Sequence, residues 1–111
     1  MTLAKEQGVD FVFDMPNLVK PVLREEDVKR RLALVPFQDK GRYFTYVGAT
    51  ADEGQLKEAV SLVNKYSEVI GLKLYAGKSI GDLAIVEEEN QKKIYSILTK
   101  YNYQGVLAVH C

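Results

Sequence analysis

The sequence predicts an α/β protein whose four parallel strands alternate with helices. Short apolar runs rich in β-branched and aromatic residues alternate with segments in which apolar residues recur at helical spacing. The runs are nearly continuous in apolar residues, as is typical of parallel strands that helices cover. The links between them are short enough for right-handed crossovers, which connect parallel strands within one sheet. An α/β arrangement is therefore the fold class that the sequence favours.

Four apolar runs have the composition of strands. A Met-Pro-Asn turn closes the first run, and a glycine-rich loop at residues 76–82 follows the third. The predicted strands are residues 11–13, 43–49, 69–75 and 105–109.

Three segments between these runs have the periodicity of amphipathic helices, and they span residues 24–35, 52–66 and 87–101. The last of them begins with acidic residues, which suit the positive end of a helix dipole. Residues 3–7 have the pattern of the end of another helix, with Gly8 as its stop. The predicted apolar stripes are Val28, Leu32 and Val35; Leu56, Ala59, Val60 and Val63; and Ile94, Ile97, Leu98 and Tyr101.

The two ends of the chain bear on its size. The sequence begins partway through a predicted helix and stops shortly after the last predicted strand. We therefore expect the whole chain, residues 1–111, to be a fragment of a larger (β/α)8 barrel, which needs ~250 residues. The alternatives are a compact four-stranded α/β domain and a flavodoxin-like binding module, which needs a helix after the last strand. A sheet cut in this way has open edges and an uncovered apolar face, so we expect association.

The composition excludes several classes of protein. The 15 Lys and Arg residues balance 15 Asp and Glu residues, so there is no basic excess for nucleic-acid binding. No run approaches the ~20 apolar residues of a membrane span, and the polar start has no signal peptide, so we expect a cytoplasmic protein. The only cysteine is Cys111 and the only histidine is His110. This chain alone therefore completes neither a disulfide nor a histidine-built metal site.

Lys73 is the sharpest candidate for a functional residue. It lies within an apolar run, where a lone ammonium is costly, so it must be paired, neutralised or modified unless its head reaches water. A neutral lysine can act as a base or nucleophile, or react with carbon dioxide. The resulting carbamate behaves as a carboxylate, which can bridge two metal ions. Polar residues at or after the ends of the predicted strands are Asp14, Asn17, Thr50, Lys73, Tyr75 and His110.

Two further strand-end residues have alternative interpretations. His110 is equally consistent with a hydrogen-bonded structural histidine and with a metal ligand. Asn17 either shapes the turn after Met15 and Pro16 or holds a substrate carboxylate or carbonyl through its amide. Residues 77–81 lack the glycine spacing of a phosphate-binding loop, so nucleotide binding is not expected there.

Four segments together resemble the dihydroorotases, which are cyclic amidohydrolases of the amidohydrolase superfamily. The similarity runs from about Gly8 to the end of the chain. The resemblance implies a metal-dependent (β/α)8-barrel hydrolase that reversibly closes N-carbamoyl-aspartate into dihydroorotate in pyrimidine biosynthesis. It also implies that the predicted strands are the second to the fifth of that barrel. The four segments are Asp14-Met15-Pro16-Asn17, Gly48-Ala49-Thr50, Gly71-Leu72-Lys73-Leu74-Tyr75 and Val109-His110-Cys111.

The same resemblance implies roles for three residues. Carbamylated Lys73 bridges two zinc ions, His110 binds the second zinc, and Asn17 binds the substrate's carboxylate. In the family, a bridging hydroxide attacks the amide carbonyl that the metals polarise, and an aspartate shuttles the proton. The family's His-x-His pair, its later histidine ligand and that aspartate have no counterpart in this sequence. We therefore expect an incomplete zinc site, no catalytic base and no appreciable dihydroorotase activity from the isolated chain.

Two alternatives to a dihydroorotase stay open. An allantoinase or hydantoinase would share the barrel and the bridging lysine, although the Met-Pro-Asn turn favours a dihydroorotase. A non-catalytic α/β remnant that acts only in assembly would account for the missing ligands. The expected partners are a small-molecule substrate and either the remainder of the barrel or another copy of the chain.

Overall fold

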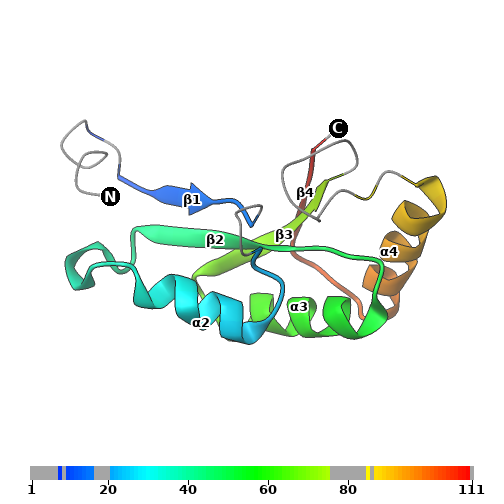
Figure 1. The fold of residues 1–111 in the computed structure, drawn as a ribbon, viewed down its shortest axis with the longest axis horizontal. Coiled ribbons are helices and arrows are strands. Elements are labelled where there is room, and N and C mark those ends of the chain that lie inside the picture. The colour runs from blue at the N-terminus through cyan, green and yellow to red at the C-terminus, as the bar shows by residue number, and fades with distance from the viewer. Residues whose placement is uncertain (1–7, 9, 17–20, 76–84, 86, 111) are drawn as a thin grey trace.

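Four parallel strands form one sheet in the computed structural model, which describes residues 8, 10–16, 21–75, 85 and 87–110 (Figure 1). Each strand pairs in parallel with the next one along the chain, in the order β1-β2-β3-β4. This arrangement confirms the prediction of four parallel strands. Their bounds are β1 (Val12–Asp14), β2 (Tyr43–Gly48), β3 (Val69–Tyr75) and β4 (Val106–His110).

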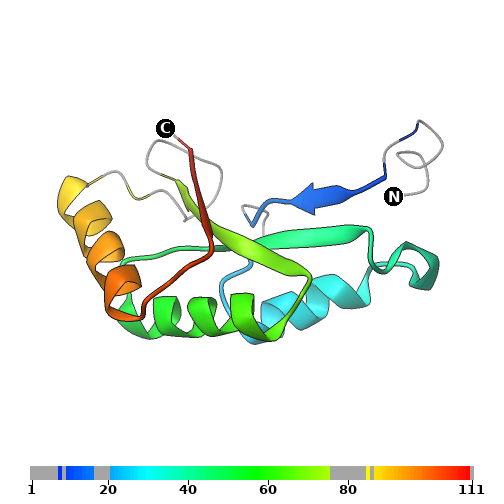
Figure 2. The ribbon, with the colours of Figure 1, turned by 180° about the vertical axis from the view of Figure 1, so that it is seen from behind.

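The three α-helices of the described residues alternate with the strands and lie on one side of the sheet, which Figures 1 and 2 show from opposite directions. They are α2 (Glu25–Ala33), α3 (Glu53–Lys65) and α4 (Glu88–Lys100). A chain that winds in one sense with right-handed crossovers places every helix on the same face of the sheet. A doubly wound sheet would have helices on both faces. The fold is thus an α/β half-barrel in which the described helices cover one face of the sheet, and the other, called the uncovered face, has no helix among the described residues.

The element boundaries follow local capping. In front of α2, the Asp27 carboxylate accepts hydrogen bonds from the backbone N–H groups of Leu23 and Arg24, at 3.1 and 3.0 Å. At α3, the Asp52 side chain accepts from the Gln55 N–H at 3.1 Å, which caps the first turn.

The sequence-based bounds differ from the structure mainly between α2 and β2. The helix predicted over residues 24–35 ends at Ala33, and a short 3₁₀ helix, η1 (Phe37–Asp39), follows Pro36. Proline disfavours helical geometry in the residue before it, which explains the early end. The predicted helix end at residues 3–7 and the loop at 76–82 lie outside the described residues.

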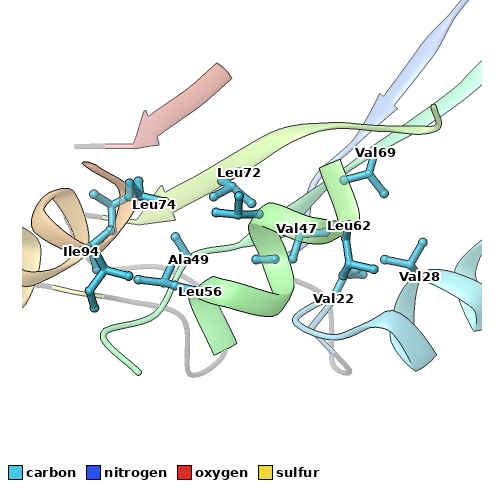
Figure 3. Close-up of a cluster of buried hydrophobic side chains, with 14 residues drawn as sticks. Val22, Val28, Val47, Ala49, Leu56, Leu62, Val69, Leu72, Leu74 and Ile94 are labelled. Atoms are coloured by element: carbon cyan, nitrogen blue, oxygen red, sulfur yellow. The ribbon is translucent and has the colours of Figure 1, made fainter. Parts of the chain in front are cut away.

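The hydrophobic core lies between the sheet and the helices (Figure 3). Val47 of β2 and Leu72 of β3 are fully buried there, as is Leu56 of α3. Burying one such side chain stabilises the fold by roughly 1.5–3 kcal/mol. The predicted stripes on α3 and α4 supply Leu56, Ala59, Val60, Ile94, Ile97 and Leu98 to this core. Within the described part of the chain, no helix is long and apolar enough to cross a membrane.

Gln55 ties the carboxyl end of β2 to the segment before α2. Its side chain is buried, and its Oε1 accepts from the N–H and the hydroxyl of Thr50 at 3.0 and 2.9 Å. Its Nε2 donates to the carbonyl oxygens of Gly48 and Leu23, at 2.8 and 2.9 Å. All hydrogen-bonding capacity of this buried amide is therefore used, and the loop after β2 is fixed at the edge of the sheet.

Candidate functional site

Lys73 lies on the uncovered face of the sheet. Its neighbours along β3, Leu72 and Leu74, are fully buried in the core on the helix side, and successive side chains of a strand point to opposite faces. Lys73 itself is partly exposed. Its register partners on the two adjacent strands are Gly48 and Ala108. The lysine is thus flanked across the sheet by two very small residues.

His110 reaches the same face from the neighbouring strand. It ends β4 and is the register partner of Tyr75, the last residue of β3. The Tyr75 and His110 rings have centroids 5.9 Å apart. The Lys73 Nζ lies 5.5 Å from the centroid of the Tyr75 ring. Lys73, Tyr75 and His110, called the strand-end cluster below, therefore gather at the carboxyl ends of β3 and β4.

The environment of Lys73 contains no counter-ion in the described part of the chain. None of the ion pairs among the described residues includes Lys73. The contact with the Tyr75 ring is a cation–π interaction, which stabilises an ammonium by about 0.5–1 kcal/mol where the site is exposed. The cluster thus holds a cation next to an aromatic ring and an imidazole.

Tyr75 is the member of the cluster that sequence reasoning gave no role. It is only 3% exposed, and its buried hydroxyl has no hydrogen-bond partner among the described residues. Burial raises the pKa of Tyr75, and the negative charge of Asp14 raises that pKa further. The hydroxyl therefore stays protonated at neutral pH and is available as a donor. Strand alternation could have revealed it, because Tyr75 follows Lys73 by two positions.

Asp14 belongs to the helix side of the sheet rather than to the strand-end cluster. Its register partner is the buried Thr45. Its carboxylate accepts from the Tyr43 hydroxyl at 2.7 Å and forms an ion pair with Arg31 of α2. Burial and this hydrogen bond raise the pKa of Tyr43 to about 12. The side chain that ends β1 thus fastens α2 to the sheet.

The uncovered face continues toward β1 as an aromatic surface. Phe13 and Phe44 stack with ring centroids 5.4 Å apart, and the Phe11 ring lies 6.2 Å from Phe44. Phe11 and Phe13 are 56% and 53% exposed, and Val106 on the opposite edge strand is 55% exposed. Large apolar side chains that gather on one face with this exposure are typical of an interaction surface.

Gly71 permits the close approach of β3 and β4 beneath the strand-end cluster. A Cβ atom at this position would lie 2.6 Å from the carbonyl oxygen of Val106 and 3.1 Å from its Cβ. A contact of 2.6 Å with a backbone atom essentially never occurs, so only glycine fits here without a shift of the backbone. The glycine of the Gly-Leu-Lys-Leu-Tyr segment therefore has a packing role on the same face as Lys73.

The described residues do not complete a metal site. They contain no group of three or more His, Cys, Asp or Glu side chains gathered to hold a metal ion. Zinc in proteins takes at least three protein ligands, and a lysine ammonium is not one of them. His110 and a carbamylated Lys73 would contribute two ligands. Asn17, the predicted substrate contact, lies outside the described residues.

A hollow elsewhere in the molecule does not involve the cluster. It measures about 370 Å³ and lies between α4 and β4, with Tyr95, Leu98 and Leu107 among its lining residues.

Comparison with known proteins finds no protein-family model that matches the chain and no curated protein that is detectably similar to it.

Proposed function

We propose that this chain is part of a (β/α)8-barrel amidohydrolase of the dihydroorotase type, which reversibly closes N-carbamoyl-aspartate into dihydroorotate. The observation that carries the proposal is the position of Lys73 and His110, each of which lies beside Tyr75. These two residues are far apart in the sequence, yet both lie at the carboxyl ends of adjacent parallel strands, on the uncovered face. Active sites of barrel enzymes are built at this end of the strands.

The architecture supports the barrel part of the proposal. The strands follow one another in sequence order, and all three helices lie on one side (Figures 1 and 2). In a closed barrel the edge strands are paired, and the face away from the helices fills the interior. The exposed Phe13 on β1 and the exposed Val106 on β4 lie on the face away from the helices and are then covered in the interior.

The chemistry requires a modified lysine. Carbamylated Lys73 would bind two zinc ions, and His110 would bind one of them. Zinc would supply a hydroxide at neutral pH and would polarise the amide carbonyl. Asn17 would bind the substrate's carboxylate. Gly48 and Ala108 leave room for the enlarged side chain of Lys73. The remaining ligands and the proton-shuttling base would come from outside the described residues.

Reconstitution of the barrel tests this proposal. The chain is co-expressed with a polypeptide that carries the remaining strands of a dihydroorotase barrel, and hydrolysis of dihydroorotate is measured with zinc present. We expect turnover that is lost in Lys73→Ala and in His110→Ala, and retained in Lys57→Ala on the exposed face of α3. Turnover of hydantoin or allantoin alone would move the assignment to those amidohydrolases. A complex that assembles without turnover of any of them would favour the non-catalytic alternative.

The isolated chain provides the complementary test. Two ligands hold zinc weakly and leave its bound water poorly placed. We therefore expect the purified 111-residue chain to show no dihydroorotase activity above background. Turnover by the mass-verified chain would contradict the assignment of ligands and base to other parts of the barrel.

A further inference from the structure

We propose that the Tyr75 hydroxyl donates a hydrogen bond to a carbamate on Lys73 and so stabilises the modified lysine. The inference rests on the proposed function, which requires the carbamate, and adds a residue that positions it. Tyr75 acts here through Lys73 rather than on the substrate, so it is a positioning residue.

The buried Tyr75 hydroxyl lacks a hydrogen-bond partner among the described residues. Tyr75 is 3% exposed, and its oxygen is buried without a hydrogen-bond partner among the described residues. Burying a hydroxyl without a partner costs free energy, and native proteins satisfy the large majority of such groups. A tyrosine hydroxyl in this position therefore indicates an acceptor that is present in the functional molecule.

Lys73 lies next to the Tyr75 ring. Its Nζ lies 5.5 Å from the centroid of the Tyr75 ring, and the two residues share one face of β3. An ammonium only donates hydrogen bonds, so it cannot accept the tyrosine proton. A carbamate places two acceptor oxygens beyond the same nitrogen. The modification thus converts the side chain next to Tyr75 from a donor into an acceptor.

The charges around Lys73 are compatible with the modification. No carboxylate among the described residues pairs with the Lys73 ammonium, so the change from cation to anion breaks no ion pair there. The change gives up the cation–π contact with the Tyr75 ring, and the new hydrogen bond from the Tyr75 hydroxyl offsets that loss. Among the described residues, the Tyr75 ring lies next to the Lys73 Nζ, and the imidazole of His110 lies beside that same ring. A hydrogen bond from a neutral donor to an ionised acceptor is stronger than one between neutral groups.

The reaction balances without a further reagent. The lone pair of the neutral Lys73 amine forms a bond to the carbon of carbon dioxide, and one electron pair of a C=O bond moves to its oxygen. One N–H proton then leaves to the buffer. The product is a carbamate with one negative charge, and nothing is oxidised or reduced.

Carbamate trapping tests the inference on the chain itself. The protein is equilibrated with ¹³C-bicarbonate and zinc, alkylated with a trialkyloxonium reagent, digested and mapped by mass spectrometry. We expect the trapped carbamate on the peptide that contains Lys73, and about tenfold less of it in Tyr75→Phe, as the loss of one charge-assisted hydrogen bond implies. Carbamates on exposed lysines such as Lys57 serve as the internal control and stay unchanged.

Folding stability separates this role from a purely structural one. Without bicarbonate, Tyr75→Phe keeps the ring and removes an unpartnered hydroxyl, so the variant is expected to be at least as stable as the original chain. Equal carbamate occupancy in the two proteins overturns the role of Tyr75 and leaves the proposed function intact. Absence of a carbamate on Lys73 in the unsubstituted chain overturns the inference, whereas the proposed function is judged separately by the turnover of the reconstituted barrel.

Discussion

The imidazole of His110 lies beside the phenol ring of Tyr75, with ring centroids 5.9 Å apart, because β3 and β4 pair in a register that places these residues opposite each other. The same register places Lys73 opposite Ala108. An aromatic ring, a cation and an imidazole thus meet at one end of the sheet.

Gly71 is expected to tolerate no side chain. Gly71→Ala would put a Cβ 2.6 Å from the Val106 carbonyl oxygen, so the two strands must separate. Such overpacking costs about 1–3 kcal/mol of unfolding free energy, measurable by urea denaturation. Gly54→Ala is the matched control, because its Cβ would meet only Asp52 Oδ2 at 3.6 Å. This helical substitution should stabilise the protein by up to about 1 kcal/mol. Equal effects at both positions would contradict the close approach at Gly71.

Gln55→Ala is expected to loosen the edge of the sheet next to the strand-end cluster. The change leaves the carbonyl oxygens of Gly48 and Leu23 without their side-chain donor and removes the acceptor of Thr50. Buried groups left without partners cost about 1–3 kcal/mol each, so a loss of at least about 2 kcal/mol is expected. Gln104→Ala, at an exposed position, should change stability by less than about 0.5 kcal/mol. A Gln55 variant as stable as the Gln104 variant would contradict this account.

Asp14→Asn is expected to weaken the attachment of α2 to the sheet. The Arg31 side chain is 12% exposed and would lose its ionised partner. Leaving a largely buried charge unpaired is destabilising, by about 3–5 kcal/mol for full burial and less at this partly open site. Glu88→Gln removes an exposed pair with Lys92, for which the expected change is below about 1 kcal/mol. Thermal unfolding of both variants measures the difference. Equal losses of stability in the two variants would contradict the prediction, because the Asp14–Arg31 pair would then contribute no more than the surface pair.

Tyr43 is expected to make the fold sensitive to alkali. Its pKa is about 12 in the folded chain, above the ordinary value of 10, because burial and the Asp14 carboxylate disfavour the phenolate. The folded state therefore holds this proton more tightly than the unfolded state does. The stabilisation is complete below pH 10 and is lost as the pH rises toward 12. Unfolding free energies across this range should fall less steeply in Tyr43→Phe than in the original chain or in Tyr95→Phe. Parallel curves of unfolding free energy against pH for all three proteins would contradict the role of Tyr43.

Local patterns in the sequence predict much of this fold. The apolar run around Lys73 and the stripes on α3 and α4 yielded the strands, the helices and most of the core, because burial depends on residue type at fixed spacing. Alternation along β3 also places Tyr75 with Lys73. The structure of the segment after α2 was harder to predict, because a short 3₁₀ helix has no strong hydrophobic period of its own.

Other features depend on contacts that sequence spacing does not specify. Asp14 ends β1, but its direction depends on how the strand pairs with β2, and that pairing turns the carboxylate toward Arg31. Gln55 reads as one polar residue on a helix, although its four hydrogen bonds connect segments that lie apart in the sequence. The register that brings His110 to Tyr75 is likewise a property of the assembled sheet.

The most direct test of the central claim is the zinc-dependent rate of dihydroorotate hydrolysis by the reconstituted barrel, compared with the Lys73→Ala and His110→Ala complexes. The account predicts turnover with the original chain and background rates with both variants, while all three complexes assemble equally. Turnover that persists without Lys73 or His110, or assembly with no turnover at all, would contradict the claim that these strand ends form an amidohydrolase site.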